Sequence, residues 1–304
     1  MRRIITSAPE NGQDPWQGVV QPVPGNICAI LVTYHPDAEF PGRLARLSQQ
    51  FPRVFVIDNA SSDLGVAQSN RIRILRNDRN IGIAAALNMG LKCAEEAGYA
   101  WSVTFDQDSE PMDTFTEAML ASLKATGTYR VLLGANYLDV HRRRLAHRGD
   151  SHGIRPMPRT TLITSGMLLP VGFARAIGGF REDFFIDSVD HEFCLRASDH
   201  GAGLYVTKEP LMRHSIGAPV SGFRWARILS SEHPSMRKYF IARNALWAMR
   251  LHARRHPLWA SRQFARIGAE AIGILLFETD RLAKVAALLR GIKDGMTAEV
   301  RRDH

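Results

Sequence analysis

Apolar runs alternate with amphipathic stretches along the first third of the chain. β-branched and apolar runs that end in polar turns indicate strands within 26–36, 53–63, 72–78 and 100–109. Apolar residues at helical spacing predict helices within 43–51 and 80–98. Strands that alternate with helices in this way are typical of βαβ units. The sequence therefore predicts an α/β fold with a mostly parallel sheet flanked by helices.

The pattern changes at both ends of the chain. Residues 1–26 are rich in Pro, Gly, Gln and Asn, and we expect them to form a flexible leader. A catalytic domain is expected over 27–220, and a basic, mainly helical subdomain over 221–304. We place the boundary between them near residues 216–228, where the strand-like pattern ends.

Composition excludes some classes of protein. The chain has 304 residues, of which 45% are hydrophobic, and three cysteines that lie far apart without CxxC spacing. A zinc finger or a disulfide framework is disfavoured, and a reducing cytoplasm is expected. The N-terminus has no apolar core of a signal peptide, and no apolar run approaches the length of a membrane span. A net charge of +9 favours polyanionic partners such as phosphates or an anionic membrane surface.

Two carboxylates follow the fourth predicted strand. Asp106 and Asp108 are separated by one residue at the point where that strand ends. Ligands of open α/β sheets bind beyond the carboxyl ends of the strands. Carboxylate oxygens at that place can hold Mg²⁺ or Mn²⁺, which in turn holds a diphosphate. The alternative is an ordinary turn, for which Asp and Ser are also suitable residues.

Polar residues at the other strand ends indicate a nucleotide pocket. Thr33 and Asp58 fall at strand ends, and Asp58 can accept the N3–H of uracil or thymine beside the ring of Tyr34. The same Asp58 can instead cap a turn or a helix. Asn80 and Gly82 precede the alanine-rich helix, whose N-terminal amides face the phosphate region. The alternative is an ordinary capped core helix, which explains most of these residues. A G-x-G-x-x-G dinucleotide pattern is absent, which disfavours an NAD site.

A second acidic group lies in the segment FFIDSVDHEFCLRA. If a helix starts there, Asp190 and Glu192 lie in its first turn, where they either stabilise the helix dipole or supply a general base. His214 follows a strand-like run and is a candidate third metal ligand.

Several motifs in order resemble family 2 glycosyltransferases. They are LVTYHPD, VIDNASSD, RNIGIAAALNMG, DQDS, SGMLL, GGFREDFFIDSVDHEFCLR and RHSIG, and within that family the chain is most similar to bacterial rhamnosyltransferases. The resemblance runs from Ile27 to about Gly295. It implies a GT-A fold, a divalent cation, and inverting transfer of L-rhamnose from dTDP-L-rhamnose to an acceptor hydroxyl.

The resemblance also assigns roles to residues. It implies that the nucleotide pocket comprises Thr33, Tyr34, Asp58, Asn80, Gly82 and Asp106. It implies that the metal is held by Asp106, Asp108 and His214, with Asp190 as the catalytic base. VDHE stands here where many relatives have EDVD, so Glu192 competes with Asp190 for that role.

Partners follow less directly from the sequence. O-antigen or another surface polysaccharide is the first expected acceptor, and a rhamnolipid-type acceptor is the second. The basic loop 141–148 is expected to face the inner membrane surface. The same surface is one possible place for the aromatic residues Trp247, Trp259 and Phe264, which can instead pack the subdomain onto the core. A nucleotidyltransferase would need a Gly- and Lys-rich loop after the first strand, and a nucleic-acid-binding protein would need a recognition motif. The chain has neither, so we expect no nucleic-acid partner.

Overall fold

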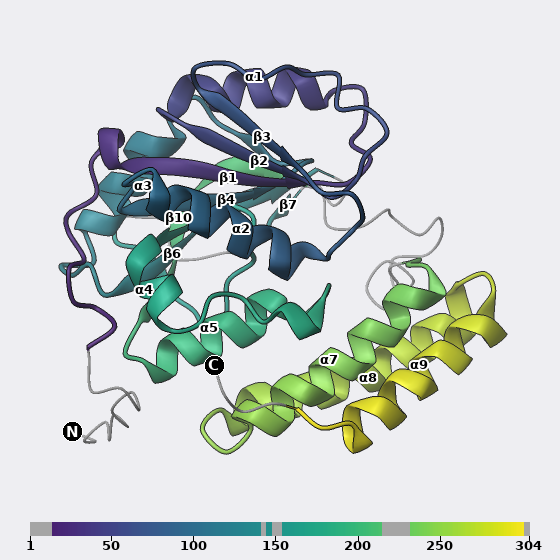
Figure 1. The fold of residues 1–304 in the computed structure, drawn as a ribbon. Helices are drawn as coiled ribbons and strands as arrows, with labels where there is room; N and C mark the ends of the chain where they lie inside the picture. The colour runs from purple at the N-terminus through teal and green to yellow at the C-terminus, as the bar shows by residue number, and fades with distance from the viewer. Residues whose placement is uncertain (1–13, 141–143, 148–153, 215–231, 301–304) are drawn as a thin grey trace, which may run out of the picture.

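One central sheet with helices on both faces forms most of the molecule, and a group of three long helices lies beside it (Figure 1). The computed structural model describes residues 14–140, 144–147, 154–214 and 232–300. The strands are β1 (Ile27–Thr33), β2 (Val54–Asp58), β3 (Ile72–Arg76), β4 (Trp101–Asp106), β5 (Glu110–Pro111), β6 (Val131–Asp139), β7 (Arg144–Leu145), β8 (Met157–Pro158), β9 (Met167–Pro170) and β10 (Gly203–His214). The helices are α1 (Phe40–Gln50), α2 (Ile83–Glu96), α3 (Phe115–Lys124), α4 (Val171–Ala176), α5 (Val189–Asp199), α7 (Ser235–His252), α8 (Pro257–Phe277) and α9 (Arg281–Thr297). The expected α/β architecture is confirmed.

The sheet is parallel at one side and mixed at the other. Its strand order is β3-β2-β1-β4-β9-β6-β10-β5, with β7 beside β6 and β8 beside β10. Strands β3, β2, β1 and β4 run parallel to one another. Strand β9 runs antiparallel to both β4 and β6. The prediction of a mostly parallel sheet therefore holds for the βαβ half, and the second half is mixed because short strands are inserted there without crossover helices.

Alternation along the buried strands builds a core on each face of the sheet. In β1, Ile27, Ala29 and Leu31 face the cluster that contains α1 and α3, while Cys28 and Ile30 face the cluster that contains α2, α4 and α5. Every residue of β1 is buried because both faces are covered. The strand ends are thereby fixed between two helix layers.

The C-terminal helices pack closely against one another and onto the core. A Cβ atom at Gly291 would lie 2.3 Å from the carbonyl oxygen of Tyr239, so α7 and α9 approach each other where no larger residue fits. Trp247 and Trp259 are buried in the core cluster, whereas Phe264 is 69% exposed. Two of the three aromatic residues considered for a membrane surface are therefore packing residues.

Part of the expected leader is attached to the core. Trp16 is buried, stacks on Phe173 with ring centroids 3.8 Å apart, and donates a hydrogen bond to the carbonyl oxygen of His200. Trp16 thus attaches this part of the expected leader to the domain. The rest of the leader, half of the basic loop 141–148, and the expected boundary at 216–228 lie outside the described residues.

Candidate active site and metal centre

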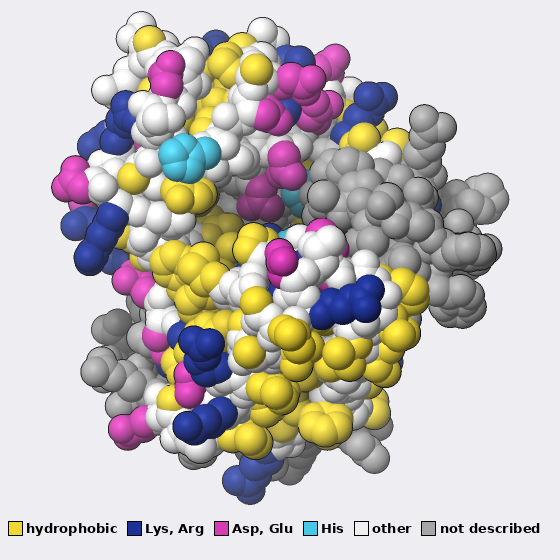
Figure 2. Space-filling view, turned by 90° about the vertical axis from the view of Figure 1, so that its right-hand side faces the viewer, with side chains coloured by type: hydrophobic (Ala, Val, Ile, Leu, Met, Phe, Trp, Pro, Cys, Tyr) yellow, Lys and Arg dark blue, Asp and Glu magenta, His cyan; other side chains and the backbone are white. Residues whose placement is uncertain are grey.

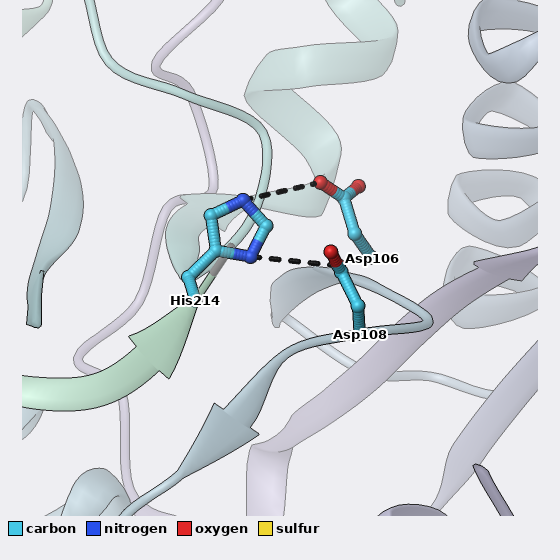
Figure 3. Close-up of side chains that lie close together, drawn as sticks. All are labelled: Asp106, Asp108 and His214. Atoms are coloured by element: carbon cyan, nitrogen blue, oxygen red, sulfur yellow. Dashed lines mark ion pairs between the residues drawn. The ribbon is translucent and has the colours of Figure 1, made fainter. Parts of the chain in front are cut away.

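Two carboxylates and an imidazole meet at the ends of two strands (Figure 3). Asp106 ends β4, Asp108 lies in the turn that follows, and His214 ends β10. His214 Nε2 lies 3.9 Å from Asp106 Oδ2, and His214 Nδ1 lies 3.5 Å from Asp108 Oδ1. One ligand atom from each side chain lies within 4.8 Å of the other two. The arrangement can hold one metal ion.

Neighbouring side chains hold His214 in place. Ser109 Oγ lies 3.3 Å from His214 Nδ1 and is itself hydrogen-bonded to Ser165 Oγ. The ring of Tyr137 meets the imidazole edge to face, with centroids 5.5 Å apart. His214 is buried, so its ring position is set by these contacts before any ligand binds.

Negative charge is concentrated at this point. Enclosure by the protein raises the pKa of Asp106 to about 6, against the opposing effect of His214, while Asp108 and Asp190 raise it further and Arg237 lowers it. A group of carboxylates with few cations around it is stabilised when a divalent cation enters. Acidic side chains line a hollow between the sheet and the helices in Figure 2.

The donor set fits a hard divalent cation. The Asp106 and Asp108 side chains are 33% and 41% exposed, so solvent or substrate oxygens can complete the coordination shell. Mg²⁺ and Mn²⁺ take carboxylate oxygens and retain open positions for phosphates. The site fits such an ion, although its identity is not fixed by the donors.

The expected nucleotide pocket lies at the ends of β1 and β2. Thr33 and Asp58 are paired in register, and Thr33 Oγ1 donates to Asp58 Oδ1 over 2.9 Å. Asp58 is fully buried and also accepts hydrogen bonds from Ser61 and from Arg76 Nε, the latter over 3.2 Å. The Arg76 side chain that binds this carboxylate is itself 52% exposed.

The remaining residues expected at the nucleotide lie around the same strand ends. Tyr34 is half exposed, and its backbone N–H donates to Gln107 Oε1, which ties the end of β1 to the acidic turn. Asn80 Oδ1 accepts the N–H of Gly82, the residue that precedes α2. Gly82 has φ 87°, and a Cβ there would lie 2.7 Å from the carbonyl oxygen of Phe185.

Asp190 and Glu192, both in the first turn of α5, have different surroundings. Asp190 lies close enough to Asp106 for its negative charge to raise the pKa of that carboxyl. Glu192 is buried and binds Arg196 through both of its oxygens, over 2.7 and 2.9 Å. Although burial favours the protonated form, the Arg196 guanidinium and His252 hold the pKa of Glu192 at about 2. A carboxylate held in this way is a weak proton acceptor, which favours Asp190 over Glu192 as the expected base.

The chain was compared with known proteins. Residues 28–184, just over half of its length, match the model of Glycosyl transferase family 2. The chain belongs to this family. It is also 27% identical over 241 residues to dTDP-rhamnosyl transferase RfbF of Shigella flexneri, covering 74% of this chain and 80% of the relative.

Solved structures of other proteins match much of this chain. The structure of GalNAc-T7 with UDP, GalNAc and Mn²⁺ matches 73% of this family 2 glycosyltransferase with a TM-score of 0.50 at 11% identity. This chain spans half of the length of that protein. Staphylococcus aureus TarS 1–349 matches 91% of this chain and 93% of its own, with a TM-score of 0.47 at 14% identity. The likeness to GalNAc-T7 agrees with the GT-A architecture predicted for this family 2 glycosyltransferase.

Sequence reasoning missed one charged residue of the site. Arg237, in the first turn of α7, binds the Asp187 carboxylate over 3.1 Å. Its positive charge also lowers the pKa of Asp106. In the sequence it is one of many basic residues on helical segments, so composition gave no reason to select it. In this family 2 glycosyltransferase, the C-terminal helices therefore contribute a cation to the acidic site.

Proposed function

We propose that the protein is an inverting, metal-dependent rhamnosyltransferase that moves L-rhamnose from dTDP-L-rhamnose to a hydroxyl of a glycan or glycolipid. The observation that carries this proposal is the cluster of Asp106, Asp108 and His214 in a family 2 chain. The similarity to a protein named as a dTDP-rhamnosyl transferase over most of both chains supports the donor. Bacterial surface polysaccharide such as O-antigen is the proposed destination of the sugar.

The acidic cluster is proposed to bind the donor diphosphate through a cation. Asp106, Asp108 and His214 would hold Mg²⁺ or Mn²⁺. A bound divalent cation supplies positive charge that stabilises a departing diphosphate. Asp106 is also proposed to face the donor, since it lies at the end of β4 beside the end of β1. Arg237 adds positive charge on the side of α7.

The nucleoside is proposed to bind at the ends of β1 and β2. Tyr34 offers an exposed aromatic ring, and Thr33 holds Asp58 in position to accept the N3–H of thymine. Arg76 leaves Asp58 when the base arrives, which keeps the buried carboxylate partnered in both states. Asn80 and Gly82 line the neighbouring turn before α2.

Asp190 is proposed to be the base of a single displacement. Its carboxylate takes the proton of the acceptor hydroxyl, whose oxygen forms a bond to the anomeric carbon. The bond from that carbon to the phosphate oxygen breaks, dTDP leaves with the electron pair, and the configuration inverts. Asp187 is bound to Arg237 and is therefore less available for this role.

The C-terminal helices are proposed to rest on an anionic membrane surface, with the enzyme on the cytoplasmic side. Exposed apolar residues form a stripe on each of two helices: Leu258, Phe264, Ile272, Leu275 and Leu276 on α8, and Leu282, Leu289 and Met296 on α9. Exposed Arg262 and Arg266 border the stripe on α8, which suits anionic headgroups. Figure 2 shows apolar side chains with scattered cations over the helical part of the face that carries the hollow. No helix in the part of the chain that is described is long and apolar enough to cross a membrane.

A vesicle assay tests the membrane contact. We expect the protein to sediment with phosphatidylglycerol-containing vesicles and not with phosphatidylcholine vesicles. Replacing Phe264 and Leu276 together by Ser should weaken binding without lowering the melting temperature, because both side chains are exposed. Val20→Ser, a change of an exposed residue in the N-terminal segment, is the control. Equal binding of both variants would contradict the proposal.

A nucleotide screen tests the donor. We expect dTDP with Mn²⁺ to raise the melting temperature more than dTDP alone, and GDP with Mn²⁺ to have little effect. Release of free rhamnose from dTDP-L-rhamnose should exceed release of sugar from UDP- and GDP-sugars. Preference for a UDP-sugar would instead indicate a family 2 transferase with another donor. Transfer to a hydroxyalkanoyl lipid rather than to a lipid-linked glycan would favour the rhamnolipid-type acceptor.

A further inference from the structure

The turn that precedes α5 has an unusual backbone. Phe185, Asp187 and Ser188 have φ values of 61°, 64° and 59°, in the left-handed region that residues with side chains rarely adopt. These residues lie directly before Val189, where α5 begins, and Ser188 is the residue that caps it. Such a backbone persists only where its surroundings hold it. The orientation of the first turn of α5, and hence of Asp190, depends on what holds these residues.

One side chain of α7 holds this turn. The amide nitrogen of Asn244 lies 2.7, 2.6 and 3.0 Å from the carbonyl oxygens of Phe184, Ile186 and Asp187. Asn244 is fully buried, so these hydrogen bonds do not compete with water. Its Oδ1 accepts the Nε–H of Arg243 over 2.8 Å, which fixes the amide with its nitrogen toward the turn.

Arg243 holds the same turn from its other end. Its Nη2 donates to the carbonyl oxygen of Asp183 over 2.7 Å and lies 3.4 Å from that of Phe184. The guanidinium also lies over the ring of Trp247, 4.2 Å from the ring centroid. Two adjacent residues of α7 therefore bind carbonyl groups of the turn and of the residues just before it.

The turn also touches the nucleotide side of the molecule. The carbonyl oxygen of Phe185 accepts the N–H of Ile83, the first residue of α2, over 2.8 Å. The carboxylate of Asp187 is bound by Arg237. A single turn thus joins α2, α5 and α7, and its geometry sets the position of Asp190 relative to the metal cluster.

We propose that Asn244 is a positioning residue for the catalytic base: it holds the left-handed turn 185–188 so that Asp190 faces the acceptor hydroxyl and the metal cluster. This inference rests on the proposed function. It makes α7 a part of the catalytic apparatus, in addition to any acceptor or membrane contact of the C-terminal helices. Within the described residues, the side-chain hydrogen bonds of Asn244 go to backbone carbonyl groups at the turn and to Arg243, so it acts through the turn.

Asn244→Ala and Asn244→Asp test the proposal in the full chain. The first removes the amide, and the second keeps its shape but replaces the N–H donors by a carboxylate. We expect kcat for sugar release from dTDP-L-rhamnose to fall about 100-fold, since a small misplacement of a reacting group has an effect of this order. KM and the Kd for dTDP with Mn²⁺, measured by calorimetry, should stay within about twofold because the strand-end groups are unchanged.

Leu288→Ala is the matched control. Leu288 is buried among the C-terminal helices in a cluster with Ala242 and Ile274, and this cluster includes no residue of the turn. Leu288→Ala should lower the melting temperature by about as much as Asn244→Ala does. Its kcat at 20 °C should stay within about twofold of the wild-type value. A loss of kcat in Leu288→Ala equal to that in Asn244→Ala would show a merely structural effect and overturn the proposal.

Arg243→Met keeps the test decisive if the Asn244 variants do not fold. It removes the group that orients the Asn244 amide, and we expect kcat to fall about 10-fold with unchanged dTDP affinity. If the Asn244 and Arg243 variants fold and have wild-type kcat, the inference about Asn244 is overturned while the proposed function stands. If the wild-type protein neither binds dTDP with Mn²⁺ nor releases sugar, the proposed function is overturned, and the inference falls with it.

Discussion

The two sides of the candidate site are held in position by different means. On the donor side, Thr33, Asp58 and Asp106 end neighbouring parallel strands, and the register of the sheet places them together. On the other side, Asp190 follows a left-handed turn that is bound by Asn244 of α7. A strand end inherits its position from many backbone hydrogen bonds, whereas the turn depends on a few side chains. We therefore expect changes on the donor side to weaken ligand binding, and changes on the α5 side to weaken catalysis at constant binding.

The largest expected effect is that of Asp190→Asn. Loss of a general base reduces the rate by about 10²–10⁴-fold. Sugar release from dTDP-L-rhamnose should fall by this factor while calorimetry shows unchanged binding of dTDP with Mn²⁺. Asp113→Asn, a change of an exposed carboxylate, should have wild-type activity. Full turnover of Asp190→Asn would show that the base is elsewhere.

Glu192→Gln should act on stability. The change leaves the buried Arg196 without its charged partner, and breaking a buried pair in this way costs about 3–5 kcal/mol. Urea unfolding should show this loss. Glu95→Gln, which breaks the exposed pair with Arg175, should cost less than about 1 kcal/mol. A Glu192→Gln variant with wild-type stability and no sugar release would restore Glu192 as the base.

Gly82→Ala tests the contact between the two sides. A methyl group there has an unfavourable backbone at φ 87° and overlaps the backbone of Phe185, so we expect a loss of about 2–4 kcal/mol. Gly98→Ala has a similar φ of 76° but nothing within 4 Å of the added carbon, and it should cost about 1–2 kcal/mol. Urea unfolding of both variants measures the difference. Equal losses would mean that Phe185 moves aside freely.

The smallest expected effect is a pH dependence of stability from His252. Burial alone would lower its pKa, but hydrogen bonds to Asp199 and Glu192 raise it above 6.5. A raised pKa in the folded state stabilises the protein fully below about pH 6.5, and the contribution is lost as the pH rises through the folded value. Glu192 behaves oppositely, since its contribution is present above pH 4.5 and is lost as the pH falls toward 2.

Unfolding free energies between pH 5 and 9 check the histidine contribution. Wild type should lose stability on the alkaline side, and His252→Gln should lose less over the same interval. Charged groups near this imidazole are contributed by α5 and by α7 with the loop that follows it: Glu192, Arg196, Asp199, Arg255 and His256. Identical pH profiles for the two proteins would show that His252 does not change its protonation on unfolding.

The βαβ half of the fold follows directly from the sequence pattern. The buried runs that end at Thr33, Asp58 and Asp106 form β1, β2 and β4, because the spacing of apolar residues and turns sets both strand and register. The family resemblance, rather than the apolar pattern, adds His214 to Asp106 and Asp108 as a metal ligand, and the structure brings these three side chains together. The mixed second half was not predicted, since strands of two to four residues carry little periodicity.

The α5 side depends on contacts that a pattern does not contain. Asn244 lies far from residues 184–188 in the chain, and nothing in its local sequence indicates which backbone it binds. The direction of Glu192, by contrast, could have been found: residues two apart on a helix point to different sides, and Arg196 four residues later is its natural partner. Helix phase alone therefore separates Asp190 from Glu192.

Direct measurement of Mn²⁺ binding tests the central claim that Asp106, Asp108 and His214 hold a cation that binds the donor. Electron paramagnetic resonance of free Mn²⁺ should show one ion bound per wild-type chain in the presence of dTDP. Asp108→Asn and His214→Ala should each weaken this binding at least about 10-fold, while Glu192→Gln, provided that it is folded, should not. Equal Mn²⁺ affinity in wild type, Asp108→Asn and His214→Ala would contradict the account.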